Sequence, residues 1–141
     1  MKYILDSSVG VKWVITENYS DKADALRADF LNAIHELLSP DVFPVEVAHA
    51  LTRAERQGRV PVGKAKDLLG DILTTPPQFH SYQSLLGRAV EISSNMRIGV
   101  YDCLYVALAE QEGCELVTAD DRLVNNLQNQ FPFVIHIATF P

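Results

Sequence analysis

Four carboxylates interrupt apolar segments of this sequence. They are Asp6 after residues 3–5, Glu46 within 42–48, Asp102 ahead of 103–109 and Asp120 after 116–119. An ionised carboxylate in apolar surroundings is very costly unless it is paired or holds a metal ion. One converging acidic pocket would explain all four positions, and oxygen-only ligands suit Mg²⁺ or Mn²⁺ better than Zn²⁺. The sequence therefore predicts a site for a hard divalent cation.

Each carboxylate also has a purely structural explanation. Asp6 and Asp120 could be N-caps of the helices that follow them, and Asp102 could be a first-turn acid. Glu46, which we place in the middle of a helix, could pair with Arg53 on the same helical face. The structural account needs four separate explanations where the pocket needs one. A cation would also remove the repulsion that raises the pKa values of clustered carboxylates.

Short apolar runs alternate with longer segments of helical spacing. We predict strands at 2–6, 37–39, 78–80, 115–118 and 133–137. We predict one helix that begins at Ser7 or Ser8 and a second that begins at residue 20, whose apolar residues keep helical spacing up to residue 37. Five further helices are predicted over 41–57, 61–73, 84–96, 100–112 and 120–128. This alternation is typical of a parallel sheet flanked by helices, here one α/β domain over 1–141. Ligands of such sheets bind beyond the carboxyl ends of the strands, where Asp6 and Asp120 lie.

The composition fits one globular domain with a real core. No apolar run reaches the ~18 residues of a membrane span, and the short N-terminal apolar run predicts a strand rather than a signal peptide. We therefore expect a cytoplasmic protein without membrane association. The two cysteines, Cys103 and Cys114, lack metal-type spacing and are expected to be reduced packing residues, with Cys103 as a nucleophile the alternative.

The net charge of −6 argues mildly against broad nucleic-acid binding, but the four carboxylates supply four of those charges. Five of the twelve basic residues crowd one stretch, which we call the basic stretch: Arg53, Arg56, Arg59, Lys64 and Lys66. A solvated helix face would explain it, and so would a surface that attracts a nucleic-acid backbone.

Other chemistries lack their motifs. The sequence has no G-x-S-x-G elbow, no P-loop and no G-x-G-x-x-G segment. His35 and His49 are lone histidines, which are more often packed or surface residues than catalysts.

Four motifs, in their order and spacing, resemble the PIN-domain ribonucleases, and within them the VapC-type toxins of toxin–antitoxin pairs. The first motif is Ile4-Leu5-Asp6-Ser7-Ser8, and the second runs from Pro44 to Leu51 and contains Glu46. The third runs from Tyr101 to Glu110 and contains Asp102, and the fourth runs from Leu116 to Leu123 and contains Asp120. The resemblance covers nearly the whole chain. One departure is Ser7, where many members carry threonine.

The resemblance implies a three-layer α/β/α sandwich with a short central parallel sheet. It implies that Asp6, Glu46, Asp102 and Asp120 are the catalytic residues, that they bind Mg²⁺ or Mn²⁺, and that Ser8 hydrogen-bonds beside them. The implied reaction is metal-dependent hydrolysis of RNA phosphodiester bonds, with the basic stretch steering the RNA. A homodimer and a cognate antitoxin that blocks the pocket are implied as well.

Three other classes of protein share some of these features. A haloacid-dehalogenase-type phosphatase needs a second aspartate where this chain has Ser8. A receiver-type phospho-acceptor domain needs paired acids after the first strand and a lysine at a late strand, and both are missing. A catalytically inactive interaction module on the PIN fold is the remaining alternative, against which the intact set of four carboxylates argues.

Overall fold

Five short strands form a fully parallel sheet in the order β3-β2-β1-β4-β5. The computed structural model describes residues 1–141, and its strands are β1 (Lys2–Leu5), β2 (Glu36–Pro40), β3 (Gln78–His80), β4 (Glu115–Thr118) and β5 (Val134–His136). The first strand lies at the centre, where Tyr3 is level with Leu37 of β2 and Leu5 with Val117 of β4. The carboxyl end of β1 therefore lies next to that of β4, although more than 100 residues separate them.

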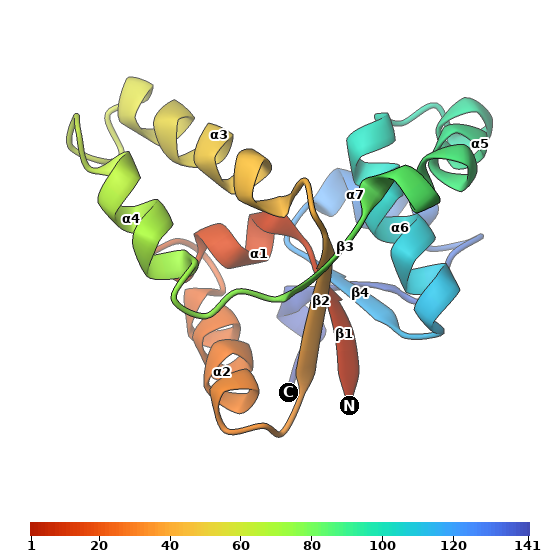
Figure 1. The fold of residues 1–141 in the computed structure, drawn as a ribbon, viewed down its shortest axis with the longest axis horizontal. Coiled ribbons are helices and arrows are strands. Elements are labelled where there is room, and N and C mark those ends of the chain that lie inside the picture. The colour runs from red at the N-terminus through yellow and green to blue at the C-terminus, as the bar shows by residue number, and fades with distance from the viewer.

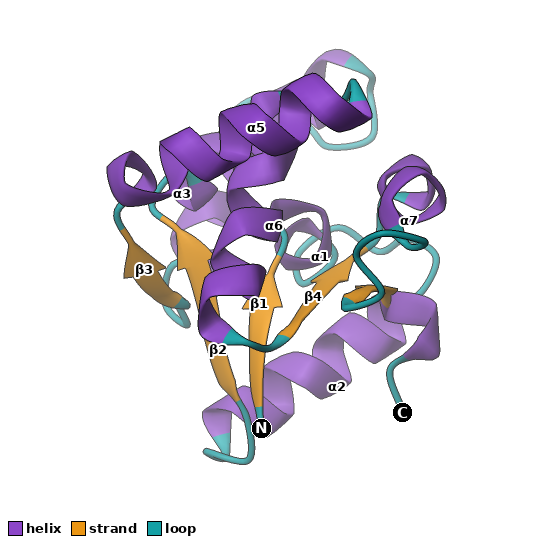
Figure 2. Cartoon of the chain, turned by 90° about the vertical axis from the view of Figure 1, so that its right-hand side faces the viewer, coloured by secondary structure: helices purple, strands orange, loops and turns teal.

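Helices cover both faces of the sheet (Figure 1). They are α1 (Ser7–Val11), α2 (Ser20–Leu31), α3 (Phe43–Arg56), α4 (Ala65–Ile72), α5 (Leu86–Met96), α6 (Val100–Glu112) and α7 (Asp121–Leu127), with 3₁₀ turns η1 (Tyr82–Leu85) and η2 (Ile137–Thr139). In Figure 1, α1 to α4 lie on one side of the strands and α5 and α6 on the other, while Figure 2 shows α6 crossing in front of the sheet. The predicted three-layer α/β/α arrangement is confirmed. No helix is both long enough and apolar enough to cross a membrane.

The core forms where the central strands meet α6. Ile4 and Leu5 of β1 are fully buried, as are Leu116 and Val117 of β4. Helix α6 buries every residue from 103 to 109, so it packs into the interior almost all round rather than on one stripe. This explains why Asp102 directly precedes an unbroken apolar run.

Two helix boundaries differ from the prediction by four residues or more. The helix from residue 20 ends at Leu31 rather than near 37, because the chain turns back through Ala33, which has a positive φ of 58°. Helix α4 begins at Ala65 rather than at Pro61, because the Glu55 carboxylate accepts hydrogen bonds from the backbone N–H groups of Gly63 and Ala65 at 2.8 and 2.9 Å. These bonds hold 61–64 as a turn.

The first residue of α3 packs closely against α1. A Cβ atom on Gly10 would lie 2.9 Å from Cζ of the fully buried Phe43 ring, so only glycine allows the two helices to approach this closely. Because α3 begins at Phe43, Glu46 lies in its first turn. Its predicted position in the middle of a helix is wrong.

Candidate active site

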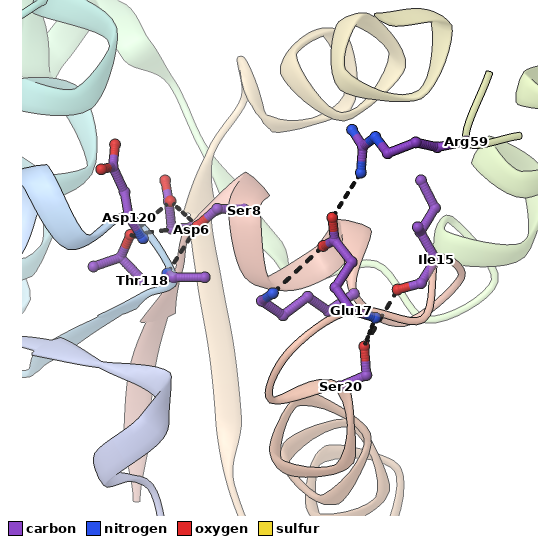
Figure 3. A network of polar contacts seen from close by, with 10 residues as sticks. Asp6, Ser8, Ile15, Glu17, Ser20, Arg59, Thr118 and Asp120 are labelled. Carbon is purple, nitrogen blue, oxygen red and sulfur yellow. Dashed lines mark hydrogen bonds and ion pairs between the residues drawn. The ribbon is translucent and has the colours of Figure 1, made fainter. Parts of the chain in front are cut away.

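Asp6 lies at the centre of the carboxyl edge of the sheet. It follows β1 as the residue before α1, and only 4% of it is exposed. Its Oδ2 accepts hydrogen bonds from Ser8 Oγ and from Thr118 Oγ1, the latter at 2.9 Å (Figure 3). The Asp6 side chain makes no capping bond to α1, so its predicted alternative role as a helix cap is absent.

The end of β4 is tied to this carboxylate through two hydroxyl groups. Ser8 Oγ accepts from the backbone N–H of Ala119 at 2.9 Å, and Thr118 Oγ1 accepts from that of Asp120 at 3.1 Å. Thr118 is fully buried. Sequence reasoning missed it, although its position two residues before Asp120 is a signal that could have found it.

Asp120 is both a helix cap and a neighbour of Asp6. Its Oδ1 accepts from the backbone N–H groups of Arg122 and Leu123 at 3.0 and 3.2 Å, so the predicted capping role is present. Its Oδ2 has no protein hydrogen bond, which leaves one oxygen for another ligand. The charge of Asp120 also contributes to raising the pKa of Asp6.

Glu46 and Asp102 come from the first turns of two helices on opposite faces of the sheet, α3 and α6. Neither forms an ion pair, and Glu46 Oε1 is buried without a hydrogen-bond partner. The predicted alternative for Glu46, a pair with Arg53, is therefore absent. Tyr105, one turn after Asp102 and fully buried, has a hydroxyl that is likewise unpartnered. Sequence reasoning missed Tyr105, whose i+3 spacing from Asp102 was the available signal.

The pKa values link all four carboxylates. Burial raises the pKa of Glu46 to about 7; the nearby Tyr105 hydroxyl opposes this, and the charges of Asp6 and Asp102 add to it. Burial, then the charges of Asp6 and Asp120, raise the pKa of Asp102 to about 6. Burial also raises the pKa of Asp6, against the hydrogen bonds from Ser8 and Thr118. The structure thus brings the four predicted side chains into one electrostatic neighbourhood.

The donor chemistry suits a hard divalent cation. As placed, no three of the His, Cys, Asp and Glu side chains form a group that could hold a metal ion. The set nevertheless offers only oxygen donors, and one of them, Glu46 Oε1, is buried with no partner. A cation would satisfy that atom and relieve the repulsion among the carboxylates, so the donor chemistry of these residues fits such an ion.

The basic stretch lies away from these carboxylates. All five side chains are exposed at the end of α3, in the following turn and in α4, which lie far from α6 in Figure 1. Arg59 pairs with Glu17 Oε2 at 2.8 Å, and Figure 3 shows this pair across α1 from Asp6. Lys12 Nζ also reaches Glu17, at 3.4 Å. Arg59 therefore supports the fold locally.

The remaining candidates lie outside the site. His49 is exposed on α3, and His35 pairs with Asp29 at 3.4 Å. Cys103 is fully buried, and burial, with the charge of Asp102, raises the pKa of its thiol to about 11. Both cysteines are free. A thiol this hard to ionise is a poor nucleophile at neutral pH, so Cys103 is a packing residue.

Comparison with known protein families shows the family of this chain. The model of the PIN domain matches residues 3–126. The chain belongs to the PIN-domain family. A curated relative, Ribonuclease VapC3 of Pyrobaculum aerophilum, is 30% identical over 137 residues, covering 96% of this chain and 98% of the relative. Ribonuclease VapC3 of Mycobacterium tuberculosis is 36% identical over 105 residues, 74% of this chain and 73% of its own. Within the PIN family, the chain is thus of the VapC type.

Solved structures share the PIN fold. The crystal structure of PAE2754 from Pyrobaculum aerophilum superposes with a TM-score of 0.67 at 22% identity, over 99% of this chain and 94% of that one. The crystal structure of VapBC2 from Rickettsia felis, bound to a DNA fragment from their promoter, matches with a TM-score of 0.64 at 15% identity over 96% and 97% of the two chains.

Proposed function

We propose that this PIN-domain protein is a Mg²⁺- or Mn²⁺-dependent endoribonuclease and the toxin of a type II toxin–antitoxin pair. The observation that carries the proposal is that four carboxylates, from the ends of β1 and β4 and from the first turns of α3 and α6, lie close enough for their charges to raise one another's pKa values. In a chain of the VapC type, this is the expected setting for hydrolysis of RNA.

The four carboxylates have different tasks in the proposed reaction. Asp6 is held in one orientation by Ser8 and Thr118, so it would anchor one or two cations. Asp120 would offer Oδ2 and Asp102 its whole carboxylate, while Glu46 would bind a cation or orient the attacking water. When bound, the cation would lower the pKa of water and stabilise the charge on the phosphate and on the leaving 3′-oxygen.

The proposed partners are RNA in the cytoplasm, a cognate antitoxin and a second copy of this chain. The antitoxin is supported by the solved structure of VapBC2, one chain of which has the same fold as this protein. Its proposed action is to cover the carboxylates and block access of RNA. The homodimer rests on the family resemblance.

A cleavage assay tests the proposed activity. Purified protein should cut RNA with Mg²⁺ or Mn²⁺ and stop when EDTA is added. The matched variants are Asp120→Asn and Asp121→Asn, because the adjacent Asp121 points to solvent and pairs with His136 at 2.8 Å. We expect cleavage to be lost in the first and kept in the second. No cleavage by the wild type under any divalent cation, with normal folding, would favour the inactive interaction module instead.

A further inference from the structure

A cavity of about 260 Å³ opens beside two of the proposed catalytic aspartates. Asp102 and Asp120 contribute to its wall, and so do Arg97 and Arg122. Arg97 comes from the loop between α5 and α6, and Arg122 from the first turn of α7; Figure 2 shows that loop and α7 at the same end of the molecule. Asn126, one turn after Arg122, lies on the same face of α7 and also lines the cavity.

The two guanidinium groups have no partner within the protein. Neither donates a hydrogen bond nor forms an ion pair, although two aspartates line the same cavity. Three other arginines of this acidic chain are used internally: Arg27 pairs with Asp71 at 3.0 Å, Arg59 with Glu17 at 2.8 Å and Arg88 with Glu110 at 2.7 Å. Arg53 and Arg56 also lack a partner, but they belong to the basic stretch, away from these aspartates. Arg97 and Arg122 are therefore free to bind an anion that enters beside Asp102 and Asp120.

The backbone at Arg97 gives a second, independent indication. Arg97 ends α5 in the left-handed conformation, with φ of 57°, where glycine is the usual residue. Helix α6 ends in the same conformation with Gly113, at φ of 63°. An arginine at such a position carries a conformational cost that glycine does not. Unlike glycine, the arginine places a guanidinium group on the wall of this cavity.

We propose that Arg97 and Arg122 bind the RNA phosphate next to the scissile one and so hold the strand across Asp102 and Asp120. This inference rests on the proposed function. Guanidinium groups match phosphate oxygens with two parallel hydrogen bonds, and they keep their charge at any physiological pH. Two such groups would attract the RNA backbone to the wall of the cavity beside Asp102 and Asp120, which would otherwise repel it.

Steady-state cleavage of a short RNA by Arg97→Gly and Arg122→Ala tests the assignment. Each variant should raise KM about tenfold with kcat little changed, because a flanking phosphate contact is lost and the chemistry is not. The slope of log affinity against log salt should fall by about 0.7 for each arginine removed. Arg97→Lys keeps the charge without the planar fork and should fall between wild type and Arg97→Gly.

Two features of the design keep the result interpretable. Glycine suits the left-handed backbone, so Arg97→Gly should unfold at the wild-type temperature or above it, and a loss of affinity cannot come from misfolding. Arg88→Gln removes one positive charge from α5 at an exposed pair and should leave KM and the salt slope unchanged.

The outcomes separate this inference from the function on which it rests. If the wild type cleaves RNA and both variants keep its KM and salt slope, the arginines bind no RNA phosphate and the inference is wrong. A fall in kcat at constant KM would also overturn it, since the arginines would then act on the carboxylates. Absence of cleavage by the wild type would instead overturn the proposed function.

Discussion

The two halves of the acidic site are held in different ways. At the sheet edge, Asp6 accepts from Ser8 and Thr118, and Asp120 accepts from two backbone N–H groups. On the helices, Glu46 and Asp102 have no ion pair, and their pKa values rise to about 7 and about 6. The sheet half is thus oriented before any ligand arrives. In the helix half, the carboxylates of Glu46 and Asp102 are repelled by neighbouring carboxylates, and a bound cation would reduce this repulsion.

The largest expected effect comes from removing one charge in either half. Asp6→Asn and Asp102→Asn should each lower kcat/KM for RNA by at least ~100-fold, since even residues that only support metal ligands contribute 10- to 100-fold. Cleavage rates measured at saturating Mg²⁺ check this. Wild-type rates in either variant would remove that residue from the proposed set.

Hydroxyl deletions compare the two halves directly. Thr118→Val should reduce Mg²⁺-dependent activity roughly 10- to 100-fold, because Asp6 Oδ2 loses a donor that orients it. Tyr105→Phe is the matched deletion in the helix half and should have a much smaller effect, because the Tyr105 hydroxyl lies near Glu46 but forms no hydrogen bond that fixes the orientation of a carboxylate. Activity titrations with Mg²⁺ measure both. Equal losses would mean that the helix half is oriented as firmly as the sheet half.

The pH dependence of stability reports on the helix half. The pKa of Glu46 is about 7 in the folded protein against 4.5 ordinarily, so between these values the folded state binds more protons than the unfolded state. Without divalent cations, this group therefore adds stability as pH falls from about 7 toward 4.5 and loses it as pH rises. Glu46→Gln should raise Tm at pH 8 by ~3 °C or more and flatten its pH dependence.

Thermal unfolding in EDTA at pH 5.5 and pH 8 makes this measurement. Glu91→Gln, on the exposed face of α5, is the control and should leave the profile unchanged. Adding Mg²⁺ should raise the wild-type Tm more at pH 8 than at pH 5.5, since protons compete with the cation. An increase in Tm on adding Mg²⁺ that is the same at both pH values would contradict a role for Glu46 in binding Mg²⁺.

The smallest effect is expected from the basic stretch, which belongs to neither half. Replacing Arg56, Arg59 and Lys64 with alanine should weaken RNA binding by about threefold and flatten its salt dependence, with kcat unchanged. Arg59 contributes least, since its charge already faces Glu17. Fluorescence anisotropy with labelled RNA at several salt concentrations tests this. An unchanged salt slope would place the RNA elsewhere on the surface.

Sequence reasoning succeeded where local patterns determine geometry. Asp6 and Asp120 could be placed together because neighbouring parallel strands bring their carboxyl ends to one edge. The position of Glu46 within its helix could not be predicted from local sequence, because Asp41, the expected first residue of that helix, instead accepts a hydrogen bond from the backbone N–H of Tyr82, 41 residues later. Arg97 and Arg122 gave no signal, since neither stands in a basic cluster and only the packing of α7 beside the α5–α6 loop brings them together.

The pairing of β1 with β4 has a consequence during synthesis of the chain. Leu5 can pair with Val117 only after β4 has been synthesised. The same pairing brings Thr118 and Asp120 next to Asp6. Closing so long a segment is an entropic and kinetic demand that is met late in folding. A nascent chain that still lacks its last thirty or so residues has three of the four carboxylates but not the hydroxyl that orients Asp6. Such an unfinished chain therefore lacks part of the set of carboxylates and hydroxyls that we propose for RNA cleavage.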